Sequence, residues 1–271
     1  MFNQRKYRSK IALIIGAGLI LLIWWIETPA GILGKADAVG YAVCHRIDLR
    51  SFHIGIRQLP LCARCTGQYI GAMIGLLFKA LYSRRRSGFP AKRVLVVLGA
   101  LCLAYAFDGL NSYLYLPPFV KVFPTLPHLY QPTNSLRLLT GTGMGLVIAM
   151  ILYPAFVGTL FENPDMRPAI GGFKPLFFML ALSFLVDLSI LTQSPSVLYP
   201  AAVISAGGVV ILLSLAYSIL FLRILKQENK LTRLSQASFP LFLGFLVTMS
   251  QLAIFDLLRY IITRTWSGIS F

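Results

Sequence analysis

The sequence predicts an all-α integral membrane protein, a single domain over residues 1–271 built as a bundle of about seven transmembrane helices. Two observations of composition support this class. Hydrophobic residues make up 57% of the chain and charged residues only 13%, whereas a soluble domain carries about a quarter charged residues. A soluble protein of this composition would lack the polar side chains to cover its surface. A soluble globular enzyme and a disordered chain are therefore excluded.

The third observation is that the apolar residues are gathered in seven stretches, each close to the roughly 20 residues that a helix needs to cross a bilayer. They are residues 11–28, 67–83, 94–116, 135–160, 175–192, 199–222 and 239–262. The first stretch also resembles a secretory signal peptide, because it follows a basic segment and precedes Ala36-Asp37-Ala38. Its length and the interfacial pair Trp24-Trp25 favour a retained span.

The basic residues between the spans predict the orientation. Fifteen of the 25 Lys and Arg lie on one side of the predicted membrane, seven lie on the other, and three fall within spans. The basic side is expected to be cytoplasmic, which places the N-terminus inside and the loop 29–66 on the outer face of the cell membrane. Topology and anionic lipid account for the net charge of +16. No basic stripe carries interleaved aromatic residues, so no nucleic-acid partner is predicted.

The outer loop holds three of the four cysteines and two of the three histidines. Two thiolates three residues apart, Cys62 and Cys65, can bind one metal ion at the start of a helix, and a distant Cys and His complete a tetrahedron. We therefore predict that Cys44, His45, Cys62 and Cys65 hold zinc or another transition metal. His53 is the alternative to His45, because adjacent Cys and His ligands require a bent backbone.

Two other chemistries would use the same cysteines. A helix N-terminus and the neighbouring Arg64 would favour the thiolate of Cys62, as in a thiol–disulfide oxidoreductase that passes electrons to quinone. Alternatively, a disulfide such as Cys44–Cys62 would staple the loop in an oxidising compartment. The fourth cysteine, Cys102, lies within the third span, where we expect a small buried side chain.

One motif in and beside this loop resembles a known signature. It consists of Cys44-His45, Arg50-Ser51-Phe52, Gln58, Pro60 and Cys62-Ala63-Arg64-Cys65-Thr66-Gly67. This resembles the CH…RSF…Q-x-P-x-CARC-x-G signature of a family of uncharacterised prokaryotic membrane proteins, a domain of unknown function. The resemblance is close over about residues 41–71. A weaker match to a later part of the signature lies within residues 105–145, at Asp108-Gly109, Asn134, Arg137 and Thr140-Gly141.

The chain departs from the signature at two positions, with Asp48 where proline is common and His53 where an aromatic residue is common. The second departure weakens His53 as a shared ligand. The resemblance does not extend over the last three spans. It implies a polytopic membrane protein with a Cys/His motif and supplies no established reaction.

Charged and amide side chains within the outer halves of the spans predict a polar pocket beneath the loop. They are Asp108, Asn134, Arg137, Asp256 and Arg259, with Asp187 at a similar depth. A charge in the hydrocarbon region is costly, so such residues indicate function. Arginines there could clamp a phosphate, and the carboxylates could hold a metal ion. The alternative is structural ion pairing of Asp108 with Arg137 and of Asp256 with Arg259.

A specific expectation is that Asp108 and Arg137 face one another or share one pocket, with Asn134 beside them. The proline-rich segment 117–133 is expected to be non-helical and to cover that pocket. Function then follows as a hypothesis: an outward-facing membrane protein whose metal-binding loop closes over the pocket. Whether it is an enzyme stays open.

Three alternative functions remain. They are a quinone-coupled thiol–disulfide oxidoreductase, an enzyme or binder acting on lipid-linked phosphate, and an accessory subunit of a larger membrane complex. Membrane lipid is the partner common to all of them. The oxidoreductase would also bind quinone, the second alternative would bind lipid phosphate, and the accessory subunit would bind partner subunits.

Overall fold

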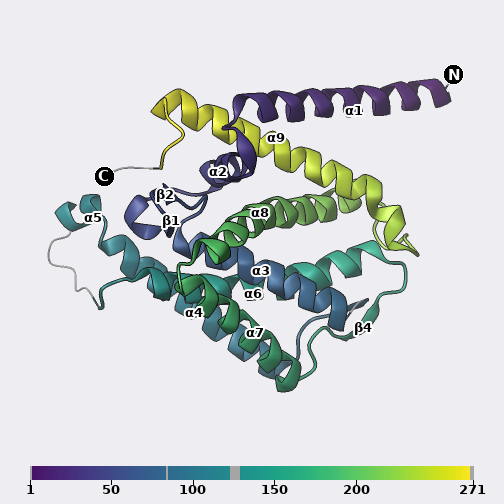
Figure 1. The fold of residues 1–271 in the computed structure, drawn as a ribbon. Coiled ribbons are helices and arrows are strands. Elements are labelled where there is room, and N and C mark those ends of the chain that lie inside the picture. The colour runs from purple at the N-terminus through teal and green to yellow at the C-terminus, as the bar shows by residue number, and fades with distance from the viewer. Residues whose placement is uncertain (1, 84, 123–128, 269–271) are drawn as a thin grey trace.

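The computed structural model describes residues 2–83, 85–122 and 129–268 (Figure 1). Helices dominate the described chain. The α-helices are α1 (Phe2–Glu27), α2 (Gly31–Val43), α3 (Ala63–Tyr82), α4 (Lys92–Leu114), α5 (Pro117–Val122), α6 (Asn134–Leu160), α7 (Phe173–Leu191), α8 (Pro195–Ile224) and α9 (Ser238–Thr263). The 3-10 helices are η1 (Asp48–Arg50) and η2 (Leu234–Ala237). The short strands are β1 (His53–Ile54), β2 (Arg57–Gln58), β3 (Arg86–Gly88) and β4 (Asp165–Pro168).

The predicted fold class is confirmed, since the protein is an all-α polytopic membrane protein. Helices α4, α6, α7, α8 and the η2–α9 unit are long and apolar enough to cross a membrane. Helices α1 and α2 are bent by 109° at the break between them and together make one further candidate span. The count of seven is not confirmed. Helix α3 covers the predicted second span, but it carries Arg64, Gln68 and Lys79 and is not among the candidate spans.

The outer loop contains more regular structure than its sequence suggests. Its first part is the helix α2, which was not predicted, and its last part holds η1 and the antiparallel hairpin of β1 and β2. The prolines of segment 117–133 were expected to exclude a helix, yet Pro117 begins the short helix α5. Proline is tolerated in a first helical turn because the N–H groups there have no helical partner. Residues 123–128 of that segment, including His128, lie outside the described residues.

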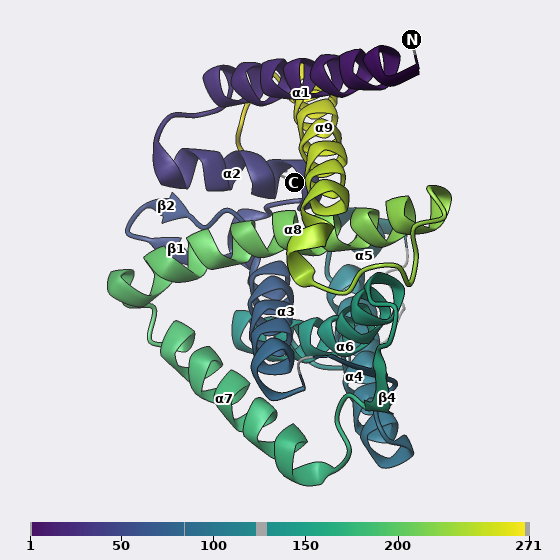
Figure 2. The same cartoon turned by 90° about the vertical axis from the view of Figure 1, so that its right-hand side faces the viewer.

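Helices α3 and α6 form the most extensive helix pair, and α3 also packs against α8, which packs against α9 (Figure 2). Glycine makes the α3–α6 approach possible. A Cβ atom on Gly67 would lie 2.2 Å from the carbonyl oxygen of Leu138, and one on Gly145 would lie 2.0 Å from that of Gln68. Small residues at such a crossing let two backbones touch in lipid. The close crossing fixes the start of α3 beside the start of α6.

Candidate metal centre

The centre forms where α2 ends and α3 begins. Cys44 caps the C-terminus of α2, and Cys62 is the N-cap residue of α3. Between them the chain turns through η1 and the β1–β2 hairpin. A Cβ atom on Gly40 would lie 1.9 Å from the carbonyl oxygen of Pro60, so glycine is required for the last turn of α2 to approach the returning chain. This contact brings the two cysteines together although 18 positions separate them.

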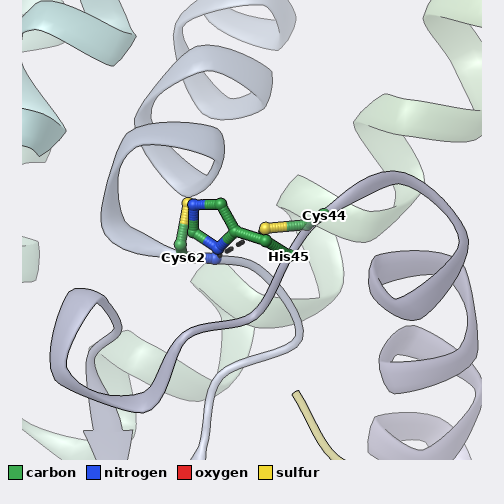
Figure 3. A group of neighbouring side chains, drawn as sticks. All are labelled: Cys44, His45 and Cys62. Atoms are coloured by element: carbon green, nitrogen blue, oxygen red, sulfur yellow. Dashed lines mark hydrogen bonds between the residues drawn. The ribbon is translucent and has the colours of Figure 1, made fainter. Parts of the chain in front are cut away.

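Three thiols and one imidazole meet at this point. Ligand atoms of Cys44, His45 and Cys62 lie within 4.8 Å of one another, and Figure 3 shows the imidazole ring between the two cysteines. Cys65, in the first turn of α3, lies outside that group of three, but its thiol hydrogen-bonds to both Cys44 and Cys62. The structure thus brings Cys44, His45 and Cys62 together as one group, with Cys65 beside the two cysteines. Three cysteines and one histidine are a donor set that suits zinc.

Of the three clustered cysteines, Cys44 has the thiol that its surroundings most favour as a thiolate. Hydrogen bonds from the Cys62 and Cys65 thiols hold the pKa of the Cys44 thiol well below its ordinary value. Its Sγ also accepts the backbone N–H groups of Arg46, at 3.5 Å, and Cys62, at 3.4 Å. Conversely, the hydrogen bond to Cys44 raises the pKa of Cys62 to about 12. All four cysteines of the chain lie within the described residues and are free, so the alternative of a Cys44–Cys62 disulfide is not found.

The imidazole of His45 is held by a backbone hydrogen bond. Its Nδ1 accepts the N–H of Ile47 at 3.2 Å, while the other ring nitrogen, Nε2, faces Cys62 (Figure 3). A neutral ring in this arrangement carries its proton on Nε2. A metal bound at Nε2 would require the other tautomer, in which Nδ1 carries the proton and the hydrogen bond from Ile47 is lost. Burial lowers the pKa of His45, which favours the neutral ring that metal binding needs. The alternative ligand, His53, lies apart from the centre and hydrogen-bonds to Asp48 at 2.8 Å.

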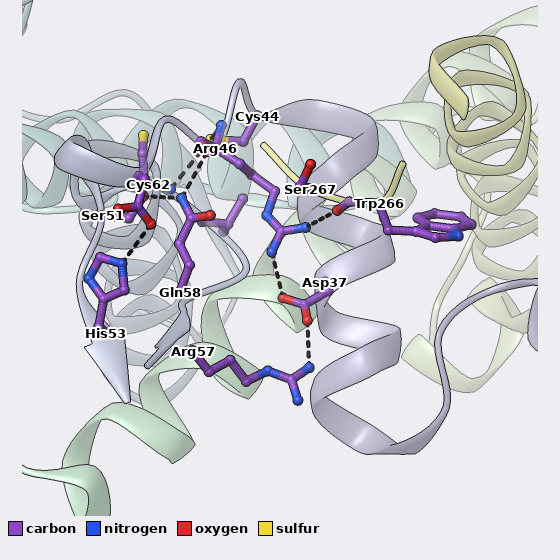
Figure 4. Close-up of polar contacts among 12 residues, drawn as sticks. Asp37, Cys44, Arg46, Ser51, His53, Arg57, Gln58, Cys62, Trp266 and Ser267 are labelled. Carbon is purple, nitrogen blue, oxygen red and sulfur yellow. Dashed lines mark hydrogen bonds and ion pairs between the residues drawn. The ribbon is translucent and has the colours of Figure 1, made fainter. Parts of the chain in front are cut away.

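Polar side chains of the outer loop form a scaffold around the centre (Figure 4). The amide nitrogen of Gln58 donates to the carbonyl of Arg46 and to the hydroxyl of Ser51, both at 2.8 Å. Arg46 has a left-handed backbone (φ 51°), and its guanidinium donates to Asp37 at 3.0 Å and to the carbonyl of Trp266 at 3.1 Å. These bonds fix the turn that follows Cys44.

Arg259 supports the centre from α9, in a role that differs from its prediction. The sequence placed this residue in the polar pocket, with an ion pair to Asp256 as the alternative. Instead, its Nη1 donates to the carbonyls of Tyr41 and Cys44, both at 2.6 Å, and its Nη2 to that of His45 at 3.3 Å. Carbonyls at a helix C-terminus have no helical partner and carry the negative end of the helix dipole. The guanidinium of Arg259 therefore donates to these free carbonyls rather than to Asp256 on its own helix.

The predicted layer of carboxylates does not converge. Asp256 accepts the indole N–H of Trp24 at 2.9 Å, and among the described residues its other oxygen has no partner. Asp256 lines a largely apolar cavity of about 420 Å³ between α1 and α9. Asp187 accepts the hydroxyl of Thr142 at 2.7 Å. Within the described chain, neither of these aspartates shares a hydrogen-bond partner with Asp108.

Asp108 forms its ion pair with Arg64, and the alternative of a structural ion pair with Arg137 is not found among the described residues. The Arg64 Nη2 atom donates to Asp108 Oδ2. The hydroxyls of Tyr130, at 2.8 Å, and Thr140, at 3.3 Å, also donate to this carboxylate. Arg64 lies in the first turn of α3, beside the metal centre. From the sequence we considered it only as a positive charge that favours the Cys62 thiolate, and did not predict its ion pair with Asp108. Tyr130, which follows α5 in the chain, thus lies against this carboxylate.

Arg137 lies near Asp108 but bonds elsewhere. Its Nη1 donates to Asn134 Oδ1 at 2.9 Å, the amide that was expected beside it. The Asn134 amide in turn donates to the carbonyls of Leu49 and Ser51, both at 3.3 Å. The start of α6 is thereby tied to the outer loop.

Cys102 is the cysteine that lies away from the centre. It was expected to be buried within the bundle, but it is exposed on α4. Only a minority of the α4 side chains are buried, so most of this helix presents an apolar surface, and a free thiol behaves there as a small apolar group. A substitution of Cys102 therefore serves as a control for the same substitution of a cysteine in the centre.

Fold and site together define a polytopic membrane protein with a Cys/His cluster between a bent helix pair and the remaining helices. Residues 44–151 match the model of a family described as "Predicted membrane protein (DUF2085)", so the resemblance to an uncharacterised membrane-protein family is confirmed. The matched segment contains the four residues of the cluster together with Asp108, Asn134 and Arg137. It does not include Asp256 or Arg259.

Two archaeal proteins are similar to this chain. An uncharacterised protein of Methanocaldococcus jannaschii is 25% identical over 126 residues, which are 46% of this chain and 71% of the relative. An uncharacterised protein of Methanothermobacter thermautotrophicus is 29% identical over 109 residues, which are 40% of this chain and 83% of the relative. No solved structure matches the chain significantly. The names of these relatives assign no activity.

Proposed function

We propose that this membrane protein binds one transition-metal ion, zinc in the first instance, through Cys44, His45, Cys62 and Cys65. The observation that carries the proposal is the meeting of three thiols and one imidazole from the end of α2 and the start of α3. Zinc bound by four protein ligands is typical of closed, structural sites, whereas catalytic sites keep one position for water or substrate. The proposal therefore assigns the ion a binding or structural role, in which it joins α2 to α3.

The surroundings support a thiolate-bound ion. Backbone N–H groups reach the Cys44 sulfur, and Arg259 binds the carbonyls that flank it. Partners of this kind orient ligands and tune a metal site. With its Nε2 protonated in the present hydrogen-bonding arrangement, His45 is the weakest of the four candidate ligands.

A second candidate function is a quinone-coupled thiol–disulfide oxidoreductase. One observation favours it. Trp24, Ala253 and Trp266 line the cavity between α1 and α9 and belong to the same hydrophobic cluster as Cys44 and Cys62. An apolar molecule in that cavity would lie one packing layer from the thiols.

Metal analysis of the purified full-length protein separates the two functions. We expect about one zinc ion per chain after purification without added metal. After chelation in denaturant without reductant, all four cysteines should titrate as free thiols. A metal-free protein in which only two thiols titrate would contradict the metal proposal and support the oxidoreductase.

We also propose that the centre lies on the outer face of the cell membrane, on the strength of the distribution of basic residues. Two exposed positions test this orientation. Ile56 lies at the tip of the β1–β2 hairpin, and Glu228 lies between α8 and α9. We expect a membrane-impermeant maleimide to label Ile56→Cys in intact cells and to label Glu228→Cys only after the cells are permeabilised, above the background of the unsubstituted chain. The reverse pattern would overturn the orientation.

A further inference from the structure

Three arginines gather within electrostatic range of His45, beside the metal centre. They are Arg50 from η1, Arg64 from α3 and Arg137 from α6, and each side chain is almost fully buried. Each guanidinium lies within electrostatic range of the other two, and all three lie within range of His45. Elements η1, α3 and α6, which are distant in sequence, thus bring three positive charges close to one another.

The carboxylates nearby do not balance this charge. Asp108 pairs with Arg64, and within the described part of the chain neither Arg50 nor Arg137 forms an ion pair. A zinc ion with three thiolates and a neutral imidazole would carry a single net negative charge, so an excess of positive charge remains even beside a filled metal centre. Buried guanidinium groups in a membrane protein are costly unless they are paired.

Many of the donors of these arginines are also unused. Among the described residues, the guanidinium of Arg137 makes a single hydrogen bond, to Asn134. Arg50 donates from Nη2 to the carbonyl of Ser112 at 2.7 Å. The Nε atoms of Arg64 and Arg137 are buried and have no hydrogen-bond partner in the described residues. An unmade hydrogen bond at a buried charged group costs free energy that a ligand could recover.

We propose that Arg50, Arg64 and Arg137 bind an oxyanion, the phosphate of a lipid headgroup or free phosphate. The planar fork of a guanidinium matches two phosphate oxygens, and such bonds are stronger than neutral ones. The site lies at the start of α3 and of α6, beside the outer loop. The proposal uses donors that no metal ligand needs, so it stands or fails separately from the metal centre.

Binding by the delipidated full-length protein in detergent tests the site. Inorganic phosphate is titrated by calorimetry, and phosphatidylglycerol is followed by native mass spectrometry with an uncharged galactolipid as the blank. We expect one phosphate or one phosphatidylglycerol per chain. Loss of charge-assisted hydrogen bonds in Arg137→Gln should weaken this binding about tenfold or more. Binding of phosphate alone identifies a soluble anion, and competition between phosphate and the lipid identifies a headgroup.

The matched control is Arg223→Gln, which removes an exposed charge from the last turn of α8 and should leave binding unchanged. Arg50→Gln provides a second variant should Arg137→Gln fold poorly, as judged by its melting temperature. Both site variants should keep the metal content of the wild type, which separates this test from that of the metal centre. The proposal is overturned if neither probe binds the wild type, or if the folded site variants bind as tightly as Arg223→Gln.

Discussion

Cys62→Ser is expected to lower the metal content of the purified protein from about one ion per chain to near zero. Serine stays protonated at neutral pH and offers zinc no anionic sulfur. The same residue is buried at the N-cap of α3, so a metal bound to its thiol would join α3 to the end of α2. Because metal binding contributes to the free energy of folding, a chelator should lower the melting temperature of the wild type and leave that of the variant unchanged.

Cys102→Ser is the matched control, since it makes the same chemical change on the exposed surface of α4. It should keep the wild-type metal content and the sensitivity to chelator. His45→Ala should weaken metal binding less than Cys62→Ser, because its ring must first lose the Nε2 proton. Equal metal content in Cys62→Ser and Cys102→Ser would exclude the proposed centre.

The helices were predictable because the bilayer constrains sequence strongly. An apolar stretch of about 20 residues has little alternative to a helix in lipid, and each of the seven stretches is helical in the structure. Helix α2 was not predicted, because a helix of 13 residues is too short to cross the membrane alone. Its bend against α1 depends on tertiary packing, as does the central placement of the more polar α3.

The site was predictable in part. The clustering of cysteines and histidines in one loop, and the spacing of Cys62 and Cys65, pointed to this group, and the chain between Cys44 and Cys62 turns back through η1 and the β1–β2 hairpin. The partners of Asp108 and Arg259 were not predictable in this way. Depth along a span follows from the sequence at 1.5 Å per residue, but the side of the bundle that a residue faces depends on how the helices pack.

Arg64→Met is expected to destabilise the protein by about 3–5 kcal/mol, the usual effect of removing one partner of a buried ion pair. Asp108 is 1% exposed, and Arg64 is its ion-pair partner. Without the guanidinium, the hydroxyls of Tyr130 and Thr140 would be left to stabilise a buried carboxylate. Unfolding in detergent, followed by circular dichroism, measures the effect. Arg137→Gln is the control, because Arg137 does not bond to Asp108 and its removal should cost much less.

The double change Arg64→Met with Asp108→Leu distinguishes an ion pair from a packing role of the arginine. If the two charges matter chiefly to one another, the double variant should recover much of the stability that Arg64→Met loses, since apolar side chains of similar volume often replace a buried pair without cost. A double variant as unstable as Arg64→Met would show that the Arg64 side chain acts through Ser112 and the α4 backbone instead. Wild-type stability in Arg64→Met would contradict the pairing itself and return Arg137 as the partner of Asp108.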